Sequence, residues 1–339
     1  MMIIAYDGTN YVGWQMQPNG TAIEEVINRE LSELLHEQIV VAGASRTDSG
    51  VHALGNVAVF DTETRIPAEK ICFALNQRLP DDIVIQSSCE VPVDFHPRHA
   101  QCTKTYEYRI YNAIHPNPMK RRYSYFVYAP LDINAMREAA KYIIGEHDFA
   151  SFCSTHAQVK TTVRTIYSLE ILTDDDLKPD GTKIIEESEK RVETENREET
   201  KNSDELGNRE EAEISDELGN RLEAEKRGML PISKNVSGKS LVKYENCVLS
   251  MVKSESRKYQ TTDIRIRISG NGFLYNMVRI IVGTLCKVGY HFYPAEHVKE
   301  IIEGCDRGLA GPKAPAEGLT LIGIEYPELT VGTDMPRLE

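Results

Sequence analysis

The first hundred residues alternate periodic apolar segments with short β-branched runs. Between residues 21 and 37, apolar side chains recur every three or four positions, which predicts an amphipathic helix that starts with Thr21 and Glu24 as a capping box. A second helix is predicted over 68–79. Strands are predicted before residue 5 and at 38–42, 56–60, 83–88 and 103–112. The order strand, helix, strand, strand, helix, strand is typical of a ferredoxin-like or RRM-like unit.

The second half repeats this order. A helix is predicted over 132–144, with Asp132 as its N-cap and Gly145 just past its end. Strands follow at 163–172 and 263–269, and then a helix at 273–288. We expect an α+β protein of two such subdomains. The predicted domains are 1–97 and 98–327, followed by a tail at 328–339.

An acidic segment, at about 174–262, interrupts the second domain. Its centre is duplicated, because NSDELGNREEAE at 202–213 and ISDELGNRLEAE at 214–225 match at ten of twelve positions. Such a composition buries too little apolar area to offset chain entropy, which predicts disorder or a loose solvated helix. The run at 246–252 favours an added strand, so the far end of the insert stays open. The insert is either a tolerated loop expansion or an acidic arm that binds a partner.

Composition indicates a soluble globular protein, with 339 residues of which 41% are hydrophobic and 27% charged. The net charge of −13 argues against a nucleic-acid partner, but residues 174–239 hold 20 acids and 12 bases and so carry much of it. Basic residues cluster elsewhere, which allows a local basic face.

Cysteine and histidine usage bears on compartment and metal content. The seven cysteines include no CxxC pair, which favours free thiols in a reducing cytosol, and no signal peptide or membrane segment is visible, so we expect a cytoplasmic protein. His96 and His99 flank Pro97, which makes a helical metal site improbable, and no metal site is expected.

The nonapeptide SRTDSGVHA at 45–53 is the main candidate for chemistry. Asp48, Ser49 and Gly50 are also typical of an ordinary turn. Arg46 would share one side of an extended segment with Asp48, where a cation favours the ionised carboxylate, and His52 adds a polar group that a turn does not need. Loops held between strands often carry catalytic groups, so we interpret this one as part of an active site.

The nonapeptide, together with AYDGTNYVGWQ at 5–15, resembles the tRNA pseudouridine synthase A (TruA) family, in which an RTDxGVHA loop carries the catalytic aspartate. Three further segments resemble this family in the same order: KTYEYR at 104–109, GFLYNMVR at 272–279 and APAEGL at 314–319. The resemblance covers about 1–173 and 263–327. It implies that the largely antiparallel sheets of the two ferredoxin-like or RRM-like subdomains join into one extended sheet, with the active-site cleft between them. The acidic insert and the very short segment before AYDGT depart from the family pattern.

The resemblance implies an isomerase that converts uridine to pseudouridine at tRNA positions 38, 39 and 40 in the anticodon stem-loop. It implies a homodimer in which one tRNA contacts both subunits, and no cofactor. Asp48 would be the nucleophile or base and Arg279 its basic partner. Tyr106 would stack on the target uracil, and its part in removing the C5 proton stays open. Arg46 would fill the space left by the everted base or contact its phosphate.

Further candidate substrate or RNA contacts are His52, Lys104, Arg109, Lys120, Arg121, Arg122 and Lys160. For His52 the main expectation is a hydrogen bond that stabilises the loop. Two other function classes stay open on the residues alone. One is an RNA-binding module without catalysis, which would need Tyr106 but not Asp48 with Arg279. The other is a metal-dependent hydrolase that uses Asp48 with Asp7.

Overall fold

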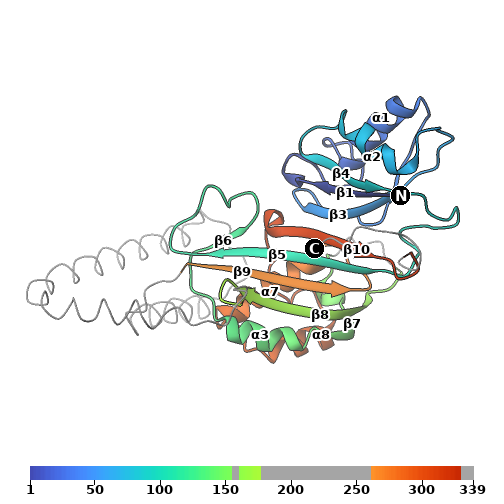
Figure 1. Ribbon diagram of the computed structural model, residues 1–339. Helices are drawn as coiled ribbons and strands as arrows, with labels where there is room; N and C mark the ends of the chain where they lie inside the picture. Colours follow the sequence, from blue (N-terminus) through green and yellow to red (C-terminus); the bar gives the residue numbers. More distant parts are fainter. Residues whose placement is uncertain (155–159, 177–260, 330–339) are drawn as a thin grey trace, which may run out of the picture. The chain divides into compact units, whose positions relative to one another are not determined.

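The structure is a computed structural model that describes residues 1–154, 160–176 and 261–329 (Figure 1). Most of the acidic insert, the predicted strand at 246–252 and residues 330–339 of the tail lie outside the described residues. The strands are β1 (Met2–Tyr6), β2 (Ala42–Gly43), β3 (His52–Val59), β4 (Ile83–Ser88), β5 (Thr103–Asn112), β6 (Tyr125–Val127), β7 (Gly145–Asp148), β8 (Val163–Thr173), β9 (Thr262–Gly270) and β10 (Leu319–Glu325). The α-helices are α1 (Ile23–Leu35), α2 (Ala68–Asn76), α3 (Ile133–Lys141), α7 (Met277–Gly289) and α8 (His297–Gly304).

The strands form one sheet, in which the order along the main path is β4-β1-β3-β10-β5-β9-β8-β7. Neighbours are antiparallel except for the pairs β3 with β10 and β5 with β6. The last strand, β10, lies between β3 and β5 and so joins the N-terminal strands to the C-terminal ones (Figure 1). This confirms the predicted α+β class and the mostly antiparallel extended sheet. The division at residue 97 stays a prediction.

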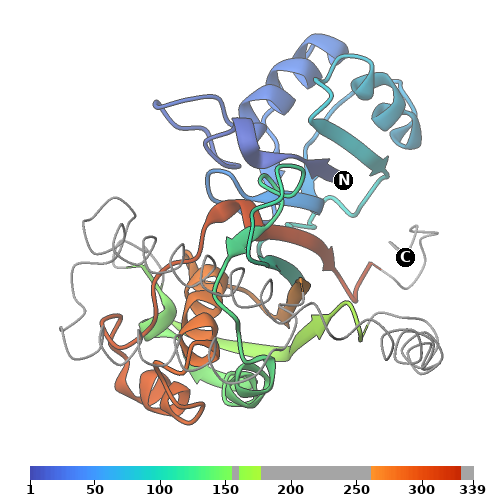
Figure 2. The same cartoon turned by 90° about the vertical axis from the view of Figure 1, so that its left-hand side faces the viewer.

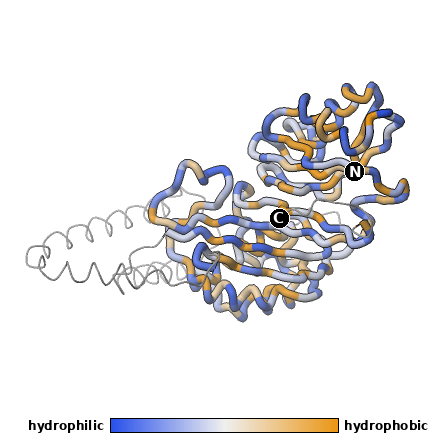
Figure 3. The backbone as a smooth tube through the Cα atoms, viewed as in Figure 1, coloured by the Kyte–Doolittle hydropathy of each residue, from blue (hydrophilic) through white to orange (hydrophobic). Residues whose placement is uncertain are grey.

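Helices cover one face of the C-terminal strands because alternate strand residues are apolar. Ile264, Ile266 and Ile268 of β9 are buried, and Tyr108 and Ile110 of β5 lie beside them in register. Helix α7 packs against β5, and α3 packs against α7 and β8. Figure 3 shows the alternation of hydrophobic and hydrophilic positions along these strands, and Figure 2 shows α1 and α2 together beside the N-terminal strands. Hydrophobic burial of this kind is the main force that stabilises the fold.

The predicted strand at 38–42 is wrong except at its last residue, since β2 spans only Ala42–Gly43. The backbone N–H of Ile39 donates to Ser32 Oγ at 2.9 Å, and that of Val41 donates to Asn28 Oδ1 at 2.9 Å. Side chains of α1 therefore take the donors that a sheet neighbour would need. A β-branched run fits either a strand or a segment bonded to helix side chains, so the sequence pattern alone could not show which of the two forms.

The first helix begins two residues later than predicted, at Ile23, and the predicted capping box at Thr21 is shifted. The Glu25 carboxylate accepts from the backbone N–H of Ala22 at 3.3 Å. Ala22 has no side-chain acceptor, so only half of the reciprocal pair forms. Glu24 instead accepts from the backbone N–H of Met16 at 3.3 Å, which ties the preceding loop to the helix.

The predicted helix at 273–288 begins four residues later, at Met277, because Asn276 adopts a left-handed backbone with φ of +62°. Residues 273–276 therefore form a turn instead of the first helical turn. Elsewhere, β4 and β5 have the predicted bounds, and Asp132 caps α3 by accepting from the N–H of Ala135. The strand predicted at 56–60 begins four residues earlier, at His52, and the helices predicted at 68–79 and 132–144 end three residues earlier, at Asn76 and Lys141.

Candidate active site

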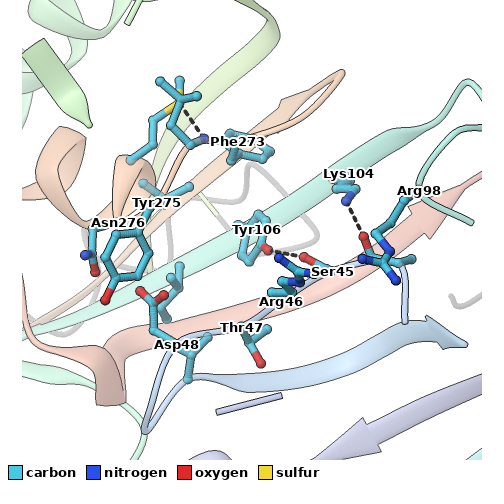
Figure 4. Close-up of a pocket in the computed structure, with 16 residues that line it drawn as sticks. Ser45, Arg46, Thr47, Asp48, Arg98, Lys104, Tyr106, Phe273, Tyr275 and Asn276 are labelled. Atoms are coloured by element: carbon cyan, nitrogen blue, oxygen red, sulfur yellow. Dashed lines mark hydrogen bonds between the residues drawn. The ribbon is translucent and has the colours of Figure 1, made fainter. Parts of the chain in front are cut away.

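A cavity of about 620 Å³ lies where three distant segments of the chain meet (Figure 4). Its volume is in the range of sites that enclose a small molecule or a single nucleotide. The first segment is the loop after β2, the second is β5 with the residues before it, and the third is the turn that precedes α7. The lining residues are Ala44, Ser45, Arg46, Thr47, Asp48, Val51, Arg98, Lys104, Tyr106, Phe273, Leu274, Tyr275, Asn276, Met277, Val278 and Leu319.

The loop that carries Asp48 is held by the AYDGTNYVGWQ segment. Gly13 pairs with Asp48 in an isolated bridge, and the Trp14 N–H donates to the Thr47 carbonyl at 3.1 Å. Gly13 has φ of +110°, and a Cβ there would lie 2.6 Å from the Thr47 carbonyl oxygen, so only glycine allows this approach. The two motifs that looked separate in sequence thus form one unit that fixes the backbone of Asp48.

Asp48, which lines the cavity, forms an ion pair with Arg279, which is not among the lining residues; Nη1 lies 3.3 Å from Oδ2. Their side chains are 18% and 9% exposed, so water screens the pair poorly. Arg279 is fixed by two other acceptors, since Nε donates to the Ala314 carbonyl at 2.8 Å and Nη1 donates to Asn276 Oδ1 at 3.1 Å. The APAEGL segment around Ala314 therefore helps to aim the guanidinium.

Burial raises the pKa of the Asp48 carboxyl above its ordinary value, while the charge and hydrogen bond of Arg279 and the charge of Lys313 lower it in part. Desolvation penalises the ionised form and a nearby cation favours it, and here burial is the larger effect. A carboxylate with a raised pKa in a cavity is a common property of catalytic groups.

Tyr106 lies on the side of the cavity formed by β5 and is 7% exposed. Its hydroxyl shares a hydrogen bond of 2.8 Å with Ser45 Oγ, and its ring meets the edge of Phe273 at a centroid distance of 5.2 Å. Burial raises the pKa of Tyr106 to about 12, with a smaller contribution in the same direction from the charge of Asp48. The hydroxyl is therefore protonated throughout the neutral pH range.

Two of the predicted basic contacts line the cavity, namely Arg46, which is exposed, and Lys104, whose Nζ donates to the Ala44 carbonyl at 2.8 Å. His52 lies outside the cavity lining and is 4% exposed. Its Nδ1 accepts from the Gly8 N–H at 3.1 Å, and its Nε2 lies 2.9 Å from the Arg122 carbonyl oxygen. These contacts tie the start of β3 to its neighbours, in keeping with a stabilising role.

The other predicted basic residues do not line this cavity. Arg109 pairs with Glu107, and Lys120 pairs with Asp263 and lies over the ring of Tyr111. Arg121, Arg122 and Lys160 are exposed. Asp7 also lies outside the lining, and its carboxylate accepts from the N–H and hydroxyl of Thr9 and from the Tyr123 hydroxyl.

Sequence reasoning missed several lining residues, among them Ser45, Arg98, Tyr275 and Asn276. Tyr275 and Asn276 belong to the GFLYNMVR segment, for which the pattern predicts a helix from residue 273. Arg98 lies between Pro97 and His99, in a segment whose histidines are its most prominent feature. The signal that could have found it is its position just before β5, on the chain segment that leads to Lys104 and Tyr106.

A half-buried carboxylate that lines a nucleotide-sized cavity and pairs with an arginine is typical of an enzyme active site. The chain matches a family model described as tRNA pseudouridine synthase over residues 2–99, 139–194 and 234–327. The protein therefore belongs to the tRNA pseudouridine synthase family and is an isomerase that forms pseudouridine in tRNA.

Curated relatives match nearly the full chain. The tRNA pseudouridine synthase A of Ruminiclostridium cellulolyticum is 38% identical over 325 residues, which is 96% of this chain and 98% of the relative. The proteins of the same name from Acetivibrio thermocellus and Clostridium acetobutylicum are each 36% identical over the same shares of the chains. These matches favour an enzyme over the alternative left open by the sequence, an RNA-binding module without catalysis.

Two further observations concern the described residues. No three potential ligands among their histidine, cysteine, aspartate and glutamate side chains gather closely enough to hold a metal ion. Within the same part of the chain, we find no helix with the length and apolar character needed to cross a membrane.

Proposed function

We propose that the protein converts uridine to pseudouridine at positions 38, 39 and 40 of the tRNA anticodon stem-loop, with Asp48 as the catalytic nucleophile or base. The observation that carries this proposal is that Asp48 lines a cavity of about 620 Å³ and forms an ion pair with Arg279. The target nucleotide must leave the base stack to reach such a cavity, as it does in other enzymes that modify bases.

The reaction rearranges bonds without any external group. The bond between N1 of uracil and C1′ of the ribose breaks, the base turns, and C5 bonds to C1′. The proton lost from C5 is balanced by a proton gained at N1. Asp48 would act at the sugar or the base while ionised. Arg279 would favour the ionised state and fix the orientation of the carboxylate.

Tyr106 would contact the target uracil, because its ring forms one side of the cavity that contains Asp48 (Figure 4). Stacking of a base on an aromatic ring contributes about 1–3 kcal/mol. Its hydroxyl is hydrogen-bonded to Ser45 and stays protonated at neutral pH, which favours stacking over a role as proton acceptor.

Outside the cavity, Arg121, Arg122 and Lys160 are exposed cations that suit recognition of an RNA by shape and backbone charge. Arg46, exposed at the cavity lining, would take the place of the everted base or contact its phosphate. A homodimer and a cytoplasmic location are part of the same proposal. The free cysteines among the described residues support a reducing compartment.

The test is to map pseudouridine in tRNA from cells that lack the gene. We expect loss of pseudouridine at positions 38–40, with restoration by the wild-type gene and none by Asp48→Ala. Unchanged modification at these positions, together with loss at another tRNA position, would contradict the positional assignment but leave the family activity intact.

A further inference from the structure

Three cations line the cavity, and within residues 1–154, 160–176 and 261–329 none of them forms an ion pair with a carboxylate. They are Arg46 on the loop after β2, Arg98 before β5, and Lys104 in β5. The one carboxylate of the lining, Asp48, is paired with Arg279. Lys104 is half-buried, whereas Arg98 is exposed. A partly buried ammonium group is costly unless a negative charge is present, so this arrangement indicates an anionic ligand.

Lys104 is held in place before any ligand arrives. Its Nζ donates to the Ala44 carbonyl at 2.8 Å, which fixes the ammonium group on the backbone of the catalytic loop. An ammonium has three donors, and this bond uses one of them. Burial lowers the pKa of Lys104, and the charges of Arg98 and Arg164 lower it further. The site thus brings like charges together without neutralising them.

The position of these cations matches the anatomy of a nucleotide. Figure 4 shows Lys104 and Arg98 on one side of Tyr106 and Asp48 on the other. A nucleotide with its C1′ at Asp48 presents its flanking phosphodiesters away from the reacting atoms. Arginine and lysine are the side chains that bind phosphate oxygens most strongly.

We propose that Arg98 and Lys104 form a subsite for a phosphodiester next to the target uridine. This inference rests on the proposed function, since the ligand is part of the same tRNA. The subsite would hold the everted nucleotide by its backbone, so that the base is free to turn after the glycosidic bond breaks.

The test is a double-mutant cycle between the enzyme and the RNA. Full-length tRNA is assembled by ligation with one neutral methylphosphonate linkage, either 5′ or 3′ of the target uridine. Wild-type protein and Arg98→Gln are compared on each tRNA through kcat/KM for pseudouridine formation. We expect roughly a ten- to hundred-fold loss from Arg98→Gln on normal tRNA, seen mainly in KM. The neutral linkage should cost the wild type a similar factor but cost Arg98→Gln little more, because both changes remove the same contact.

Three controls make the outcome decisive. Lys104→Met should show the same coupling, with melting temperature measured to detect misfolding. Arg121→Gln, an exposed arginine outside the cavity, should lose activity independently of the neutral linkage. The subsite would be overturned if, for both Arg98→Gln and Lys104→Met, the loss in kcat/KM from the substitution and the loss from the neutral linkage multiplied fully, whichever side of the target uridine carries the linkage. Failure of the wild type to modify normal tRNA would instead count against the proposed function.

Discussion

At the scale of single residues, the Asp48 carboxyl is subject to two opposing effects. Burial disfavours its charge, while Arg279 at 3.3 Å and Lys313 favour it. The balance leaves the pKa raised, so the residue is more basic than an exposed aspartate. A more basic carboxylate is also a better nucleophile or proton acceptor once it is ionised.

We predict a pH profile that follows from this balance. In the proposed mechanism the ionised Asp48 carboxylate is the active form, so kcat/KM should fall as the pH drops through a pKa above the ordinary 3.8 of aspartate. Arg279→Gln removes the largest effect that lowers this pKa, so the acidic limb should move to higher pH, besides the loss of rate. Lys313→Gln should move it in the same direction by less. An identical acidic limb in wild type and Arg279→Gln would contradict this description of the pair.

Tyr106 permits a second prediction at this scale. Its hydroxyl, with a pKa raised to about 12, is occupied by Ser45. Tyr106→Phe keeps the ring and removes one neutral hydrogen bond, so we expect turnover within about threefold of wild type. Tyr106→Ala, which also removes the ring, should lose about tenfold or more. Single-turnover rates with bound tRNA would measure both. A loss of several hundredfold in Tyr106→Phe would instead assign proton transfer to the hydroxyl.

At the scale of elements, the start of α7 decides where Arg279 points. Asn276 caps the helix with a left-handed backbone, and its Nδ2 donates to Ser154 Oγ at 2.9 Å. Its Oδ1 accepts from Arg279 Nη1, the same nitrogen that faces Asp48. A strained residue at such a place is commonly tied to function. Asn276 is therefore a positioning residue that acts through Arg279.

Replacement of Asn276 by glycine and by alanine would separate two effects: the cost of a positive φ in the backbone, and the role of the side chain in orienting Arg279. Glycine adopts a positive φ freely, whereas alanine does not, so only Asn276→Ala should lower the melting temperature markedly. Both variants lose the acceptor for Arg279, so we expect kcat to fall by roughly tenfold in both, with a smaller change in KM. Wild-type kcat in a stably folded Asn276→Gly would show that the side chain does not position Arg279.

The elements also show what the sequence could and could not predict. Strands β4 and β5 have the predicted bounds because their alternation is a local property of the chain. The segment 38–41 has equally good strand residues, yet its N–H groups bond to α1 side chains. The turn at 273–276 depends on Ser154, which is far away in sequence. The residues of the 45–53 loop point to Asp48, and the family resemblance adds Arg279. Arg98 precedes β5, but that it lines the same cavity as Asp48 depends on tertiary packing.

At the scale of the whole molecule, the site depends on residues separated by 231 positions, since Asp48 and Arg279 come from opposite ends of the chain. Strand β10 makes this possible because it pairs with both β3 and β5. The duplicated acidic segment at 202–225 falls within residues 195–233, which the family match leaves out, as it also leaves out 100–138. The cavity-lining residues lie at 44–51, 98–106, 273–278 and 319, so the duplication is separate from them in sequence, and its structure lies outside the described residues.

The most direct measurement is pseudouridine formation by the purified full-length protein and by Asp48→Asn, with tRNA binding measured in parallel. The account predicts that Asp48→Asn forms no detectable pseudouridine at positions 38–40, while its tRNA affinity stays within about threefold, since the substitution keeps the shape and removes only the charge. Formation of pseudouridine by Asp48→Asn at a rate near that of the wild type would contradict the central role of this carboxylate.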